Sequence, residues 1–569
     1  MAPLLGEAIS GIQRPLFSLD ARPDQPALER KGAVYTKPWV VDLILDLAGY
    51  VDTENLVDSV VVEPSVGEGA FLAKMIERLI RSCDRLGRPH SECFSSLIAF
   101  ELDPLSAKNA RVLAMKVLCE QGVDSRLSET LATTWVRTGD YLIDSLNVHT
   151  DFVIGNPPYV RLEDIPEQTC DIYRDLYKTM RGRADLYVGF FEAALRQLAP
   201  GGICAFICAD RWMRNQYGAE LRRLITANFA VDGVVEMHSA APFEDDVDAY
   251  PAITILRRGQ QQKIAVGSVS DVSLAIIPDD LTKNLLQGMK GLDKPSLQGV
   301  QTAIVDSWFQ GTEPWACNSP AQLTLLRRIE KSFGPLEESA SVGIGVASGS
   351  DRIFITKDPN IVENSRLLKL ALAKDIRGGE LQWSGHFLID PWEQRGLVEL
   401  DQFPRLKAYF EANAGALKER HVGQNNLKAW FRTIDRVTHE LTKKSKLYIA
   451  DIKERLHPVL DTGETYPHHN LYFVESEVWD LEVLGALLMS SVAQLFIESY
   501  AVKMRGGYLR FQAQYLRRIR VPNPESISIE IADLLRAAFR SRDVNAANHL
   551  ALELYGIDES EMETALEYR

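Results

Sequence analysis

The stretch SVVVEPSVGEGAFLAKMIERLIRSC, residues 59–83, predicts a strand, a tight turn and a helix in direct succession. Its three consecutive valines are typical of a strand that is buried on both faces, and the part from Phe71 onward has apolar residues at helical spacing. A second apolar run, SLIAFELD at 96–103, also precedes a helix-like segment. Strands that alternate with helices in this way predict a parallel sheet covered by helices on both faces.

The same alternation continues toward the middle of the chain. The segments DFVIGNPPYV (151–160), GGICAFICAD (201–210) and AITILRRG (252–259) each contain an apolar run of strand length. Residues 185–199 have the pattern of an amphipathic helix. We therefore predict a doubly wound α/β sheet, in which ligands bind beyond the carboxyl ends of the strands.

Composition narrows the class of protein. The chain has 569 residues, of which 46% are hydrophobic, and its seven cysteines include no C-x-x-C pair, so neither a disulfide framework nor a metal site is predicted. The sequence shows no signal peptide and no uncharged apolar run long enough to span a bilayer, which favours a cytoplasmic protein without membrane contact. The net charge of −15 excludes general coating of nucleic acid, so any such contact is expected to be local.

Polar residues follow the first strands at the edge where ligands are expected. In EPSVGEGAF, Gly67 and Gly69 permit a tight turn and the close approach of a ligand to the backbone, although such a turn also serves as a plain connection. Glu101 ends the second strand, where a carboxylate can accept hydrogen bonds from ribose hydroxyls. Asp140, in TGDYL, either accepts a hydrogen bond from an adenine amino group or caps a helix.

The corner NPPY at 156–159 is the most distinctive motif. Pro157 and Pro158 fix two successive φ angles and supply no N–H donor, so this turn is stiff. The side-chain oxygen of Asn156 and the carbonyl oxygen of Pro157 can both accept hydrogen bonds from one amino group, and Tyr159 offers a face for stacking a planar ring. The corner therefore suits the exocyclic amino group of a base, with a purely structural turn as the alternative.

With these motifs in this order, the sequence resembles the gamma-ordered, S-adenosylmethionine-dependent adenine-N6 DNA methyltransferases, the TaqI-like enzymes of Type II restriction-modification and phage defence. VYTKPWVVDLIL (34–45) resembles their opening cofactor motif. EPSVGEGAF, AFELDP, TGDYL and DFVIGNPPYV resemble the glycine, ribose, adenine-contact and catalytic motifs. The resemblance implies S-adenosyl-L-methionine as cofactor, bound by Tyr35, Thr36, Glu63, Pro64, Ser65, Gly67, Gly69, Glu101, Leu102, Asp140, Tyr141 and Asn156.

The resemblance also implies which residues act on the substrate and how the chain is divided. Its catalytic residues are Asn156, Pro157, Pro158 and Tyr159, and Phe243 matches the phenylalanine that packs against the extruded base. The implied parts are an N-terminal arm (1–30), a catalytic domain with a Rossmann-like sheet (31–262), a connecting segment (263–335), an α+β target-recognition domain (336–524) and a C-terminal helical tail (525–569).

Double-stranded DNA with a flipped-out adenine is the implied substrate, and a cognate restriction nuclease or a phage-defence protein is a candidate partner. The densest basic cluster in the C-terminal region is predicted either to hold DNA phosphates or to form a solvated helix face, and consists of Lys503, Arg505, Arg510, Arg517, Arg518 and Arg520. His468 and His469 are expected in a surface turn, not in a metal site.

Two other functions stay open. NPPY is shared with enzymes that methylate a glutamine amide or an RNA base, although the long C-terminal region favours DNA. A DNA-binding subunit of a defence complex, with the methyltransferase domain kept only for binding, is the second alternative. The presence of Asn156, Gly67 and Gly69 favours catalysis.

Overall fold

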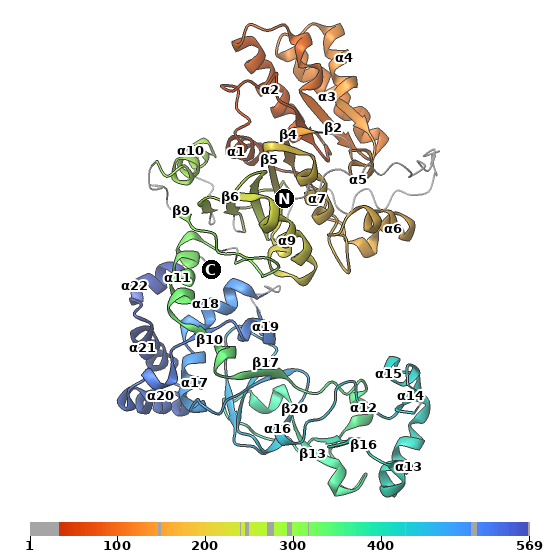
Figure 1. Ribbon diagram of the computed structural model, residues 1–569, viewed down its shortest axis with the longest axis vertical. Coiled ribbons are helices and arrows are strands. Elements are labelled where there is room, and N and C mark those ends of the chain that lie inside the picture. Colours follow the sequence, from red (N-terminus) through yellow and green to blue (C-terminus); the bar gives the residue numbers. More distant parts are fainter. Residues whose placement is uncertain are drawn as a thin grey trace.

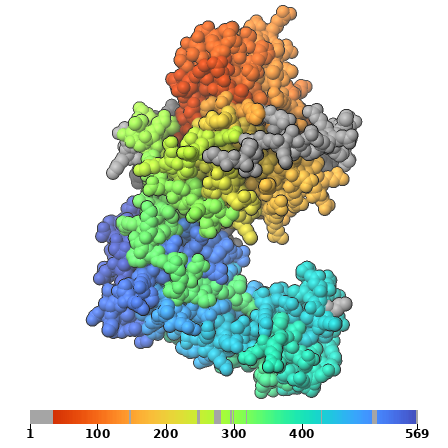
Figure 2. Space-filling view, viewed as in Figure 1, coloured from red at the N-terminus to blue at the C-terminus, as the bar shows by residue number. Residues whose placement is uncertain are grey.

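The computed structural model describes residues 34–145, 149–238, 240–244, 250–269, 278–292, 297, 299–316, 318–426, 428–501 and 509–566. Figure 1 shows an N-terminal α/β half and a C-terminal half, which meet along one side of the molecule. On the other side, the space-filling view in Figure 2 is hollowed. This hollow lies between α6 (Glu167–Leu176) and the three helices α13 (Pro404–Ala412), α14 (Ala414–Glu419) and α15 (His421–Gln424).

The N-terminal half is built, within the described residues, on one nine-stranded sheet of order β3-β2-β1-β4-β5-β7-β6-β8-β9. Its strands are β1 (Val61–Glu63), β2 (Leu97–Glu101), β3 (Val136–Thr138), β4 (Thr150–Gly155), β5 (Leu198–Ala209), β6 (Ala230–Glu236), β7 (Pro251–Arg257), β8 (Ile264–Val269) and β9 (Val300–Val305). Neighbours among β1 to β5 pair in parallel, whereas β7 lies antiparallel between β5 and β6. The predicted doubly wound α/β sheet is confirmed, and β8 and β9 extend it into the segment expected only to connect.

The valine run that predicts the first strand is buried on both faces. Val61 lies in a hydrophobic cluster with residues of α1 (Pro38–Ala48) and α2 (Ala70–Arg85), and Val62 lies in a different cluster with residues of α7 (Tyr187–Gln197). Because successive side chains of a strand point to opposite faces, helices on both sides require an apolar residue at every position. The other helices of this half are α3 (Pro104–Glu120), α4 (Ser125–Trp135), α5 (Tyr141–Asp144), α8 (Arg211–Arg214), α9 (Ala219–Asn228) and α10 (Pro278–Met289).

The parallel strands end at one edge of the sheet, and the sequence motifs lie there. β1 ends at Glu63, β2 at Glu101, and β4 at Gly155, directly before NPPY. β1 pairs with both neighbours, since Val62 lies opposite Ile98 of β2 and Val153 of β4. Strand pairing therefore brings the glycine, ribose and catalytic motifs to the same edge.

The C-terminal half is α+β, as predicted, and contains an antiparallel sheet of order β11-β21-β17-β19 and a second sheet of order β12-β14-β13-β20. Their strands are β11 (Ser341–Ile344), β12 (Ile355–Thr356), β13 (Leu367–Ala371), β14 (Phe387–Ile389), β17 (Lys446–Ala450), β19 (Val459–Asp461), β20 (Tyr466–Pro467) and β21 (Leu471–Glu475). Shorter pairs are β10 (Gly334–Pro335) with β23 (Arg520–Val521), β15 (Trp392–Glu393) with β16 (Gly396–Leu397), and β18 (Ile452–Lys453) with β22 (Leu509–Arg510). Short helices between them are α12 (Asp351–Phe354), α16 (Glu440–Lys443) and α19 (Ala513–Leu516).

The tail is helical, as predicted, with α20 (Ile529–Ser541), α21 (Val544–Tyr555) and α22 (Glu559–Leu566). α20 and α21 pack on α17 (Leu481–Leu488), and α21 also contacts α18 (Ser491–Tyr500). Across the described residues, no single helix is long and apolar enough to cross a membrane. By length and composition alone, α17 and α18 meet that requirement only as a pair, and they are bent by 62° relative to each other.

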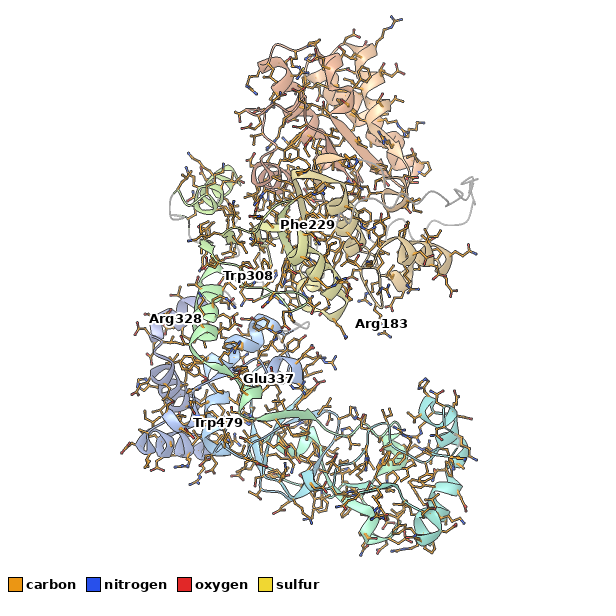
Figure 3. The ribbon with its side chains drawn as sticks, viewed as in Figure 1. Arg183, Phe229, Trp308, Arg328, Glu337 and Trp479 are labelled. Atoms are coloured by element: carbon orange, nitrogen blue, oxygen red, sulfur yellow. The ribbon has the colours of Figure 1, made fainter. Side chains whose placement is uncertain are left out.

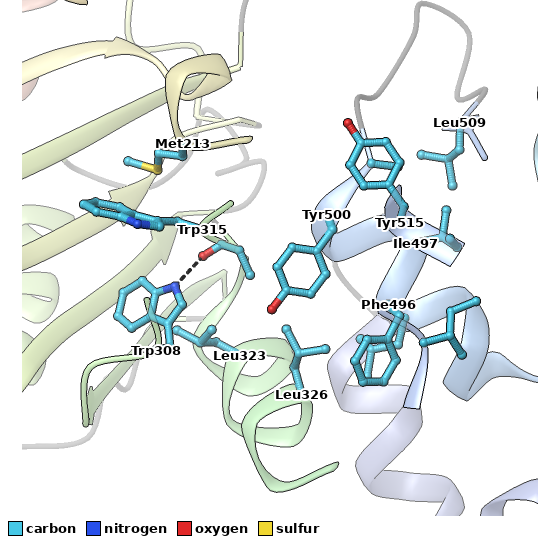
Figure 4. Packing of buried hydrophobic residues seen from close by; sticks show 14 of the residues in the cluster. Met213, Trp308, Trp315, Leu323, Leu326, Phe496, Ile497, Tyr500, Leu509 and Tyr515 are labelled. Carbon is cyan, nitrogen blue, oxygen red and sulfur yellow. Dashed lines mark hydrogen bonds between the residues drawn. The ribbon is translucent and has the colours of Figure 1, made fainter. Parts of the chain in front are cut away.

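The two halves are joined around two tryptophans. Trp308, labelled at the contact in Figure 3, donates a hydrogen bond from Nε1 to the carbonyl oxygen of Ala316 at 2.9 Å. Trp315 packs on Trp212 of the N-terminal half, with ring centroids 5.1 Å apart. Figure 4 shows α11 (Pro320–Ser332) between these tryptophans and Tyr500 of α18. One hydrophobic cluster therefore continues from the sheet into the C-terminal half.

A buried ion pair lies inside the antiparallel sheet of the C-terminal half. Lys446 of β17 and Asp461 of β19 are register partners, with Nζ 2.8 Å from Oδ2 and both side chains 0% exposed. Lys446 also donates to the carbonyl oxygens of Leu441 and Lys444. Burial lowers the pKa of Lys446; burial also raises the pKa of Asp461, but the hydrogen bond from Lys446 helps to hold that pKa below its usual value.

Replacing Lys446 by methionine leaves the Asp461 carboxylate buried without its cation. We expect the free energy of unfolding, measured by urea denaturation, to fall by about 3–5 kcal/mol. The matched control is Lys444→Met, which removes a half-exposed lysine that lies 3.3 Å from Glu475. The control is expected to cost less than about 1 kcal/mol, and equal losses for the two variants would contradict the role of the buried pair.

Candidate active site

Asn156 follows the last residue of β4 and is fixed by hydrogen bonds from its side chain. Its Nδ2 donates to the carbonyl oxygen of Val34 at 2.9 Å and to Oγ1 of Thr36 at 3.1 Å. Both acceptors come from the opening motif, up to 122 residues away in the chain. Within the part of the chain that the structure describes, the buried Oδ1 of Asn156 has no hydrogen-bond partner. The two hydrogen bonds of Nδ2 therefore fix the orientation of the amide, and Oδ1 keeps its capacity to accept a hydrogen bond.

The opening motif is in turn fixed by the loop between β6 and β7. Thr36 and Phe243 form an isolated antiparallel bridge, and the backbone N–H of Glu244 donates to the carbonyl oxygen of Tyr35 at 2.9 Å. Asn156, Thr36 and Phe243 were predicted from three separate motifs. The structure brings them together through this backbone pairing.

Tyr159 and Phe243 are in contact beside the corner. Their ring centroids lie 6.1 Å apart with an interplanar angle of 81°, so Phe243 meets Tyr159 edge to face. Tyr187, the first residue of α7, has its ring centroid 6.1 Å from that of Tyr159. Pro157 is buried and Pro158 partly exposed. The buried hydroxyl of Tyr159 has no hydrogen-bond partner among the described residues, so the ring is held by apolar packing.

The glycine turn has the backbone conformation that its sequence predicts. Gly67 and Gly69 have φ angles of +54° and +85°, and Gly69 is the residue that caps the start of α2. A Cβ atom at Gly69 would lie 2.4 Å from the end of the Leu113 side chain, which would have to shift, and the positive φ would strain any larger residue. The ring of Tyr35 lies 3.9 Å from the Cβ position of Gly67 and therefore covers the turn.

Glu101 ties the glycine turn to the end of β2. One carboxylate oxygen accepts from the backbone N–H of Gly67 at 2.8 Å, and the other accepts from that of Asp103 at 3.0 Å. Burial raises the pKa of Glu101, and these two hydrogen bonds partly oppose that rise. The next residue, Leu102, is 61% exposed. An acceptor and an apolar side chain thus lie side by side at the strand end.

Asp140 caps α5, so the helix-cap alternative is present in the structure. Its carboxylate accepts from the backbone N–H of Leu142 at 2.9 Å and from the hydroxyl of Tyr173 at 2.6 Å. Burial raises the pKa of Asp140, although both hydrogen bonds lower it. The side chain of Tyr141 is buried and donates to Gln197 at 3.2 Å. Its ring therefore faces the core, not the strand ends.

Glu63 is the most deeply buried polar residue of the site. It is 0% exposed, and neither carboxylate oxygen has a hydrogen-bond partner in the described part of the chain. Desolvation, together with the nearby Glu101, raises the pKa of Glu63 well above its usual value. Pro64 is buried and Ser65 partly exposed at the start of the turn. The sequence placed Glu63 in the site but gave no sign of its complete burial.

A buried charged network that the sequence analysis missed supports the loop carrying Phe243. Asp210, directly after β5, lies 3.0 Å from Nε2 of His238 and 3.1 Å from Arg214, and Glu236 at the end of β6 lies 2.7 Å from Nδ1 of His238. Burial lowers the pKa of His238, but the two carboxylates raise it by more. The signal was available, because Asp210 ends an apolar run in GGICAFICAD as Glu101 does in SLIAFELD.

The structure describes four of the six residues of the predicted basic cluster. Lys503 and Arg505 lie outside the described residues. Arg510 is exposed, and its guanidinium lies 3.2 Å from the carboxylate of Asp451. The side chain of Arg510 is 46% exposed, compared with 27% for Arg518, the other described member that forms an ion pair.

Two of the other three arginines of that cluster have partners within the protein, and phosphate binding by the three stays a prediction. Arg517 donates to the carbonyl oxygen of Val342 at 2.7 Å. Arg518 pairs with Glu313 across the joint between the halves, and burial lowers the pKa of its guanidinium. Arg520 lies in β23, and its Nε is buried. Sequence density alone could not distinguish cations inside an interface from cations facing solvent.

The expectation that His468 lies in a surface turn is wrong, because its side chain is buried. His468 is 5% exposed, and its Nε2 lies 3.1 Å from Asp351 at the start of α12. His469 is exposed, and its ring centroid lies 4.0 Å from that of His468. The three side chains offer ligand atoms within 4.8 Å of one another. His468 is thus a buried link between two loops of the C-terminal half.

Known proteins are similar to this chain in sequence and in fold. A family model described as Eco57I restriction-modification methylase matches residues 120–243. The chain is 41% identical over 559 residues to the Type II methyltransferase M.PaeR7I of Pseudomonas aeruginosa, covering 96% of this chain and 95% of that protein. It is 40% identical over 540 residues to the Type II methyltransferase M.XhoI of Xanthomonas vasicola, covering 94% and 98%. The solved structure of the Type IIL restriction-modification enzyme MmeI in complex with DNA has a similar fold, with TM-score 0.53, 11% identity and coverage of 94% of this chain and 76% of that one.

A doubly wound sheet that carries an NPPY corner beside a glycine turn defines a Rossmann-like methyltransferase. The nearly full-length identity of 41% and 40% shows the family more closely. The chain belongs to the Type II methyltransferases of restriction-modification systems, and the fold and family predicted from its motifs are confirmed.

The burial of Glu63 predicts a pH dependence of stability. Because its pKa is higher in the folded than in the unfolded protein, the folded state loses stability as pH rises from the unfolded pKa of about 4.3 through the folded pKa. Glu63→Gln removes this loss, so over that range the variant gains free energy of unfolding relative to wild type, by at most about 1.4 kcal/mol per pH unit.

Thermal unfolding of both proteins between about pH 5 and about pH 9 measures this difference. Glu68→Gln, at an exposed position of the same turn, is the matched control and should keep the wild-type pH dependence. A difference between Glu63→Gln and wild type that stays constant with pH contradicts the assignment.

Proposed function

We propose that this protein transfers a methyl group from S-adenosyl-L-methionine to the N6 amino group of an adenine flipped out of double-stranded DNA at a specific site. One observation carries the proposal. Considering the described residues, the buried Oδ1 of Asn156 lacks a partner, while Nδ2 of the same side chain is bonded to Val34 and Thr36. Buried polar atoms without a partner are rare, so this oxygen indicates a ligand that donates a hydrogen bond.

The residues around the glycine turn fit S-adenosyl-L-methionine, which supplies an electrophilic methyl group on sulfonium when it is bound. Glu101 keeps acceptor capacity for ribose hydroxyls, because each carboxylate oxygen can accept more than one hydrogen bond. Leu102 offers exposed apolar surface to a nucleoside, and Asp140 keeps acceptor capacity for an amino group. The buried carboxyl of Glu63, which lacks a hydrogen-bond partner among the described residues, fits the ammonium group of an amino acid.

The corner explains how a poor nucleophile can react. The lone pair of adenine N6 is delocalised into the ring, and in a duplex the amino group is also base-paired. Flipping removes the base from the stack at a cost of about a few kcal/mol, which stacking on Tyr159 offsets. Asn156 Oδ1 and the Pro157 carbonyl oxygen then accept the two N6 hydrogens, which favours electron density on nitrogen and aims it at the methyl carbon. Forming the N6–C bond would break the methyl–sulfur bond of the bound donor and leave a neutral thioether, and one N6 proton then leaves to water, so the step needs no general base beforehand.

The shape of the molecule supports DNA as the substrate. The hollow between α6 and α13 to α15 is open on one side in Figure 2. The C-terminal half forms the wall opposite α6. The glutamine-amide alternative needs no second half of this size. We therefore propose that the C-terminal α+β part is the target-recognition domain and that the catalytic domain extends through β9, which belongs to its sheet.

The relatives favour methylation over a role in DNA binding alone. Both M.PaeR7I and M.XhoI are named as methyltransferases, and RM.Eco57I of Escherichia coli, 23% identical over 220 residues, is named as a restriction enzyme and methyltransferase. A cognate restriction nuclease is thus the partner that we propose. A defence-complex subunit that only binds DNA is the second candidate, and it requires an inactive Asn156.

One experiment tests the proposal directly. The full chain is expressed in a bacterial host that lacks DNA methylation, and the modified bases of its genome are read by single-molecule sequencing. We expect N6-methyladenine within one short sequence motif. Methylation of cytosine, or unmodified DNA alongside methylated protein or RNA, would overturn the proposal.

The side-chain oxygen of Asn156 should be essential for methyl transfer but not for the fold. We expect Asn156→Ala to lower the single-turnover rate by about a hundredfold to a thousandfold, because one positioned polar group in a buried site contributes on that scale. Cofactor affinity, measured by isothermal titration calorimetry, should fall much less. Asn228→Ala, at an exposed position at the end of α9, is the control and should keep the wild-type rate. Normal turnover by Asn156→Ala would falsify its assigned role.

Tyr159 should act on the base and not on the cofactor. We expect Tyr159→Ala to weaken stacking by about 1–3 kcal/mol and so to raise KM for duplex DNA. Its cofactor affinity should stay near wild type. Phe243→Ala tests the second ring: since Phe243 meets Tyr159 edge to face, a smaller effect than that of Tyr159→Ala is expected. Unchanged kinetics of Tyr159→Ala on duplex DNA would remove the stacking claim.

A further inference from the structure

Two arginines lie on the rim of the NPPY corner. Residues 160–162 run antiparallel to residues 184–186, because the backbone N–H of Leu186 donates to Val160 at 2.7 Å and that of Leu162 donates to Ala184 at 3.0 Å. Arg161 forms the bridge of this pair with Asp185. Arg161 is two residues beyond Tyr159, so its Cα lies within about 7 Å of the corner. Arg183 precedes the paired segment by one residue.

The backbone beneath these arginines is held in place. The carboxylate of Asp185 accepts hydrogen bonds from the hydroxyls of Tyr187 at 2.8 Å and Tyr217 at 2.7 Å. Tyr187 also packs beside the ring of Tyr159, with centroids 6.1 Å apart. Residues 160–162 and 184–186 therefore belong to the same rigid wall as the corner. Gly182, with φ of +64°, forms the turn that directly precedes Arg183.

The arginine side chains, by contrast, are exposed and weakly paired. The side chain of Arg183 is 91% exposed, and that of Arg161 is 61% exposed. Each lies near the carboxylate of Glu163, at 3.8 Å and 3.6 Å, distances longer than those of direct charge-assisted hydrogen bonds. In Figure 3, Arg183 lies on the edge of the N-terminal half that faces the hollow. The side chains of Arg161 and Arg183 are also more exposed than that of Arg518, which is 27% exposed and pairs with Glu313 across the joint between the halves.

We infer that Arg161 and Arg183 bind the backbone phosphates that flank the flipped nucleotide, an inference that rests on the proposed function. A nucleotide whose base enters the corner must leave its own phosphates at the rim, within reach of these side chains. Guanidinium groups bind phosphate through two parallel hydrogen bonds. In the free protein the single carboxylate of Glu163 lies near both arginines and offsets part of their charge, and a phosphate replaces it when DNA binds.

The test measures the salt dependence of DNA binding by the full chain. The probe is a duplex oligonucleotide that contains the methylated motif identified by sequencing, and fluorescence anisotropy gives Kd between about 50 mM and about 200 mM salt. Each lost phosphate contact makes the negative slope of log K against log salt less steep by about 0.9. We therefore expect Arg161→Gln and Arg183→Gln to bind about fivefold more weakly each near 150 mM salt, and the double variant about thirtyfold more weakly.

Two further variants separate this role from charge and folding. Arg81→Gln removes an arginine of α2 that is 54% exposed and paired at 3.6 Å with Glu77, so it makes the same charge change away from the rim and should keep the wild-type slope. Glu163→Gln frees both arginines and should tighten DNA binding. Affinity for S-adenosyl-L-methionine should be equal in all variants, which shows that they are folded.

The outcomes distinguish this inference from the proposed function. A double variant whose slope equals that of wild type, or an Arg81→Gln slope that falls as far as that of the double variant, overturns the role of Arg161 and Arg183 while wild-type methylation still stands. A wild-type chain that leaves DNA unmethylated and binds the duplex without salt dependence overturns the proposed function itself. A slope lost only at the rim, together with tighter binding by Glu163→Gln, supports the inference.

Discussion

The site depends on one constraint, the orientation of the Asn156 amide. An asparagine side chain has two faces, a donor and an acceptor, and either can point into a pocket. Here Val34 and Thr36 take both hydrogens of Nδ2, so the oxygen is the atom that remains. The two following prolines cannot relax the corner, because their φ angles are fixed. The acceptor is thus set before any substrate arrives, and a donor ligand meets it without reorganisation of the protein.

That constraint reaches far along the chain. Thr36 is held because it bridges Phe243, and the loop that carries Phe243 begins at the buried ion cluster of Asp210, Glu236 and His238. Asp210 follows the end of β5, and Asn156 follows the end of β4, so the parallel sheet positions both. The sheet therefore does more than bring motifs to one edge. It also supplies the buried charges that fix the loop opposite the corner.

Local sequence patterns predict the parts of this arrangement that local physics decides. The valine run before Glu63, the glycines with positive φ and the strand-end Glu101 were all readable, because burial on two faces and steric limits act on neighbouring residues. The motif order, compared with a known family, placed Phe243. Pairings between distant segments were not readable: β8 and β9 join the sheet at its far edge, and Arg518 pairs with Glu313 across the joint between the halves. Residue type and spacing do not encode which surface a side chain will face.

If the enzyme flips a base, as proposed, the joint between the halves matters because contacts of the C-terminal half with DNA have to offset the cost of unstacking at the corner. Energy gained on the C-terminal half can offset unstacking only if that half cannot yield relative to the corner. At this joint Trp315 packs on Trp212. The Arg222 guanidinium donates to the carbonyl oxygen of Thr312 from Nε at 3.0 Å and from Nη2 at 2.9 Å. Burial lowers the pKa of Arg222 to about 10, so the guanidinium stays charged at neutral pH and its hydrogen bonds persist. Buried packing and buried hydrogen bonds therefore hold the segment 308–315 against the N-terminal half.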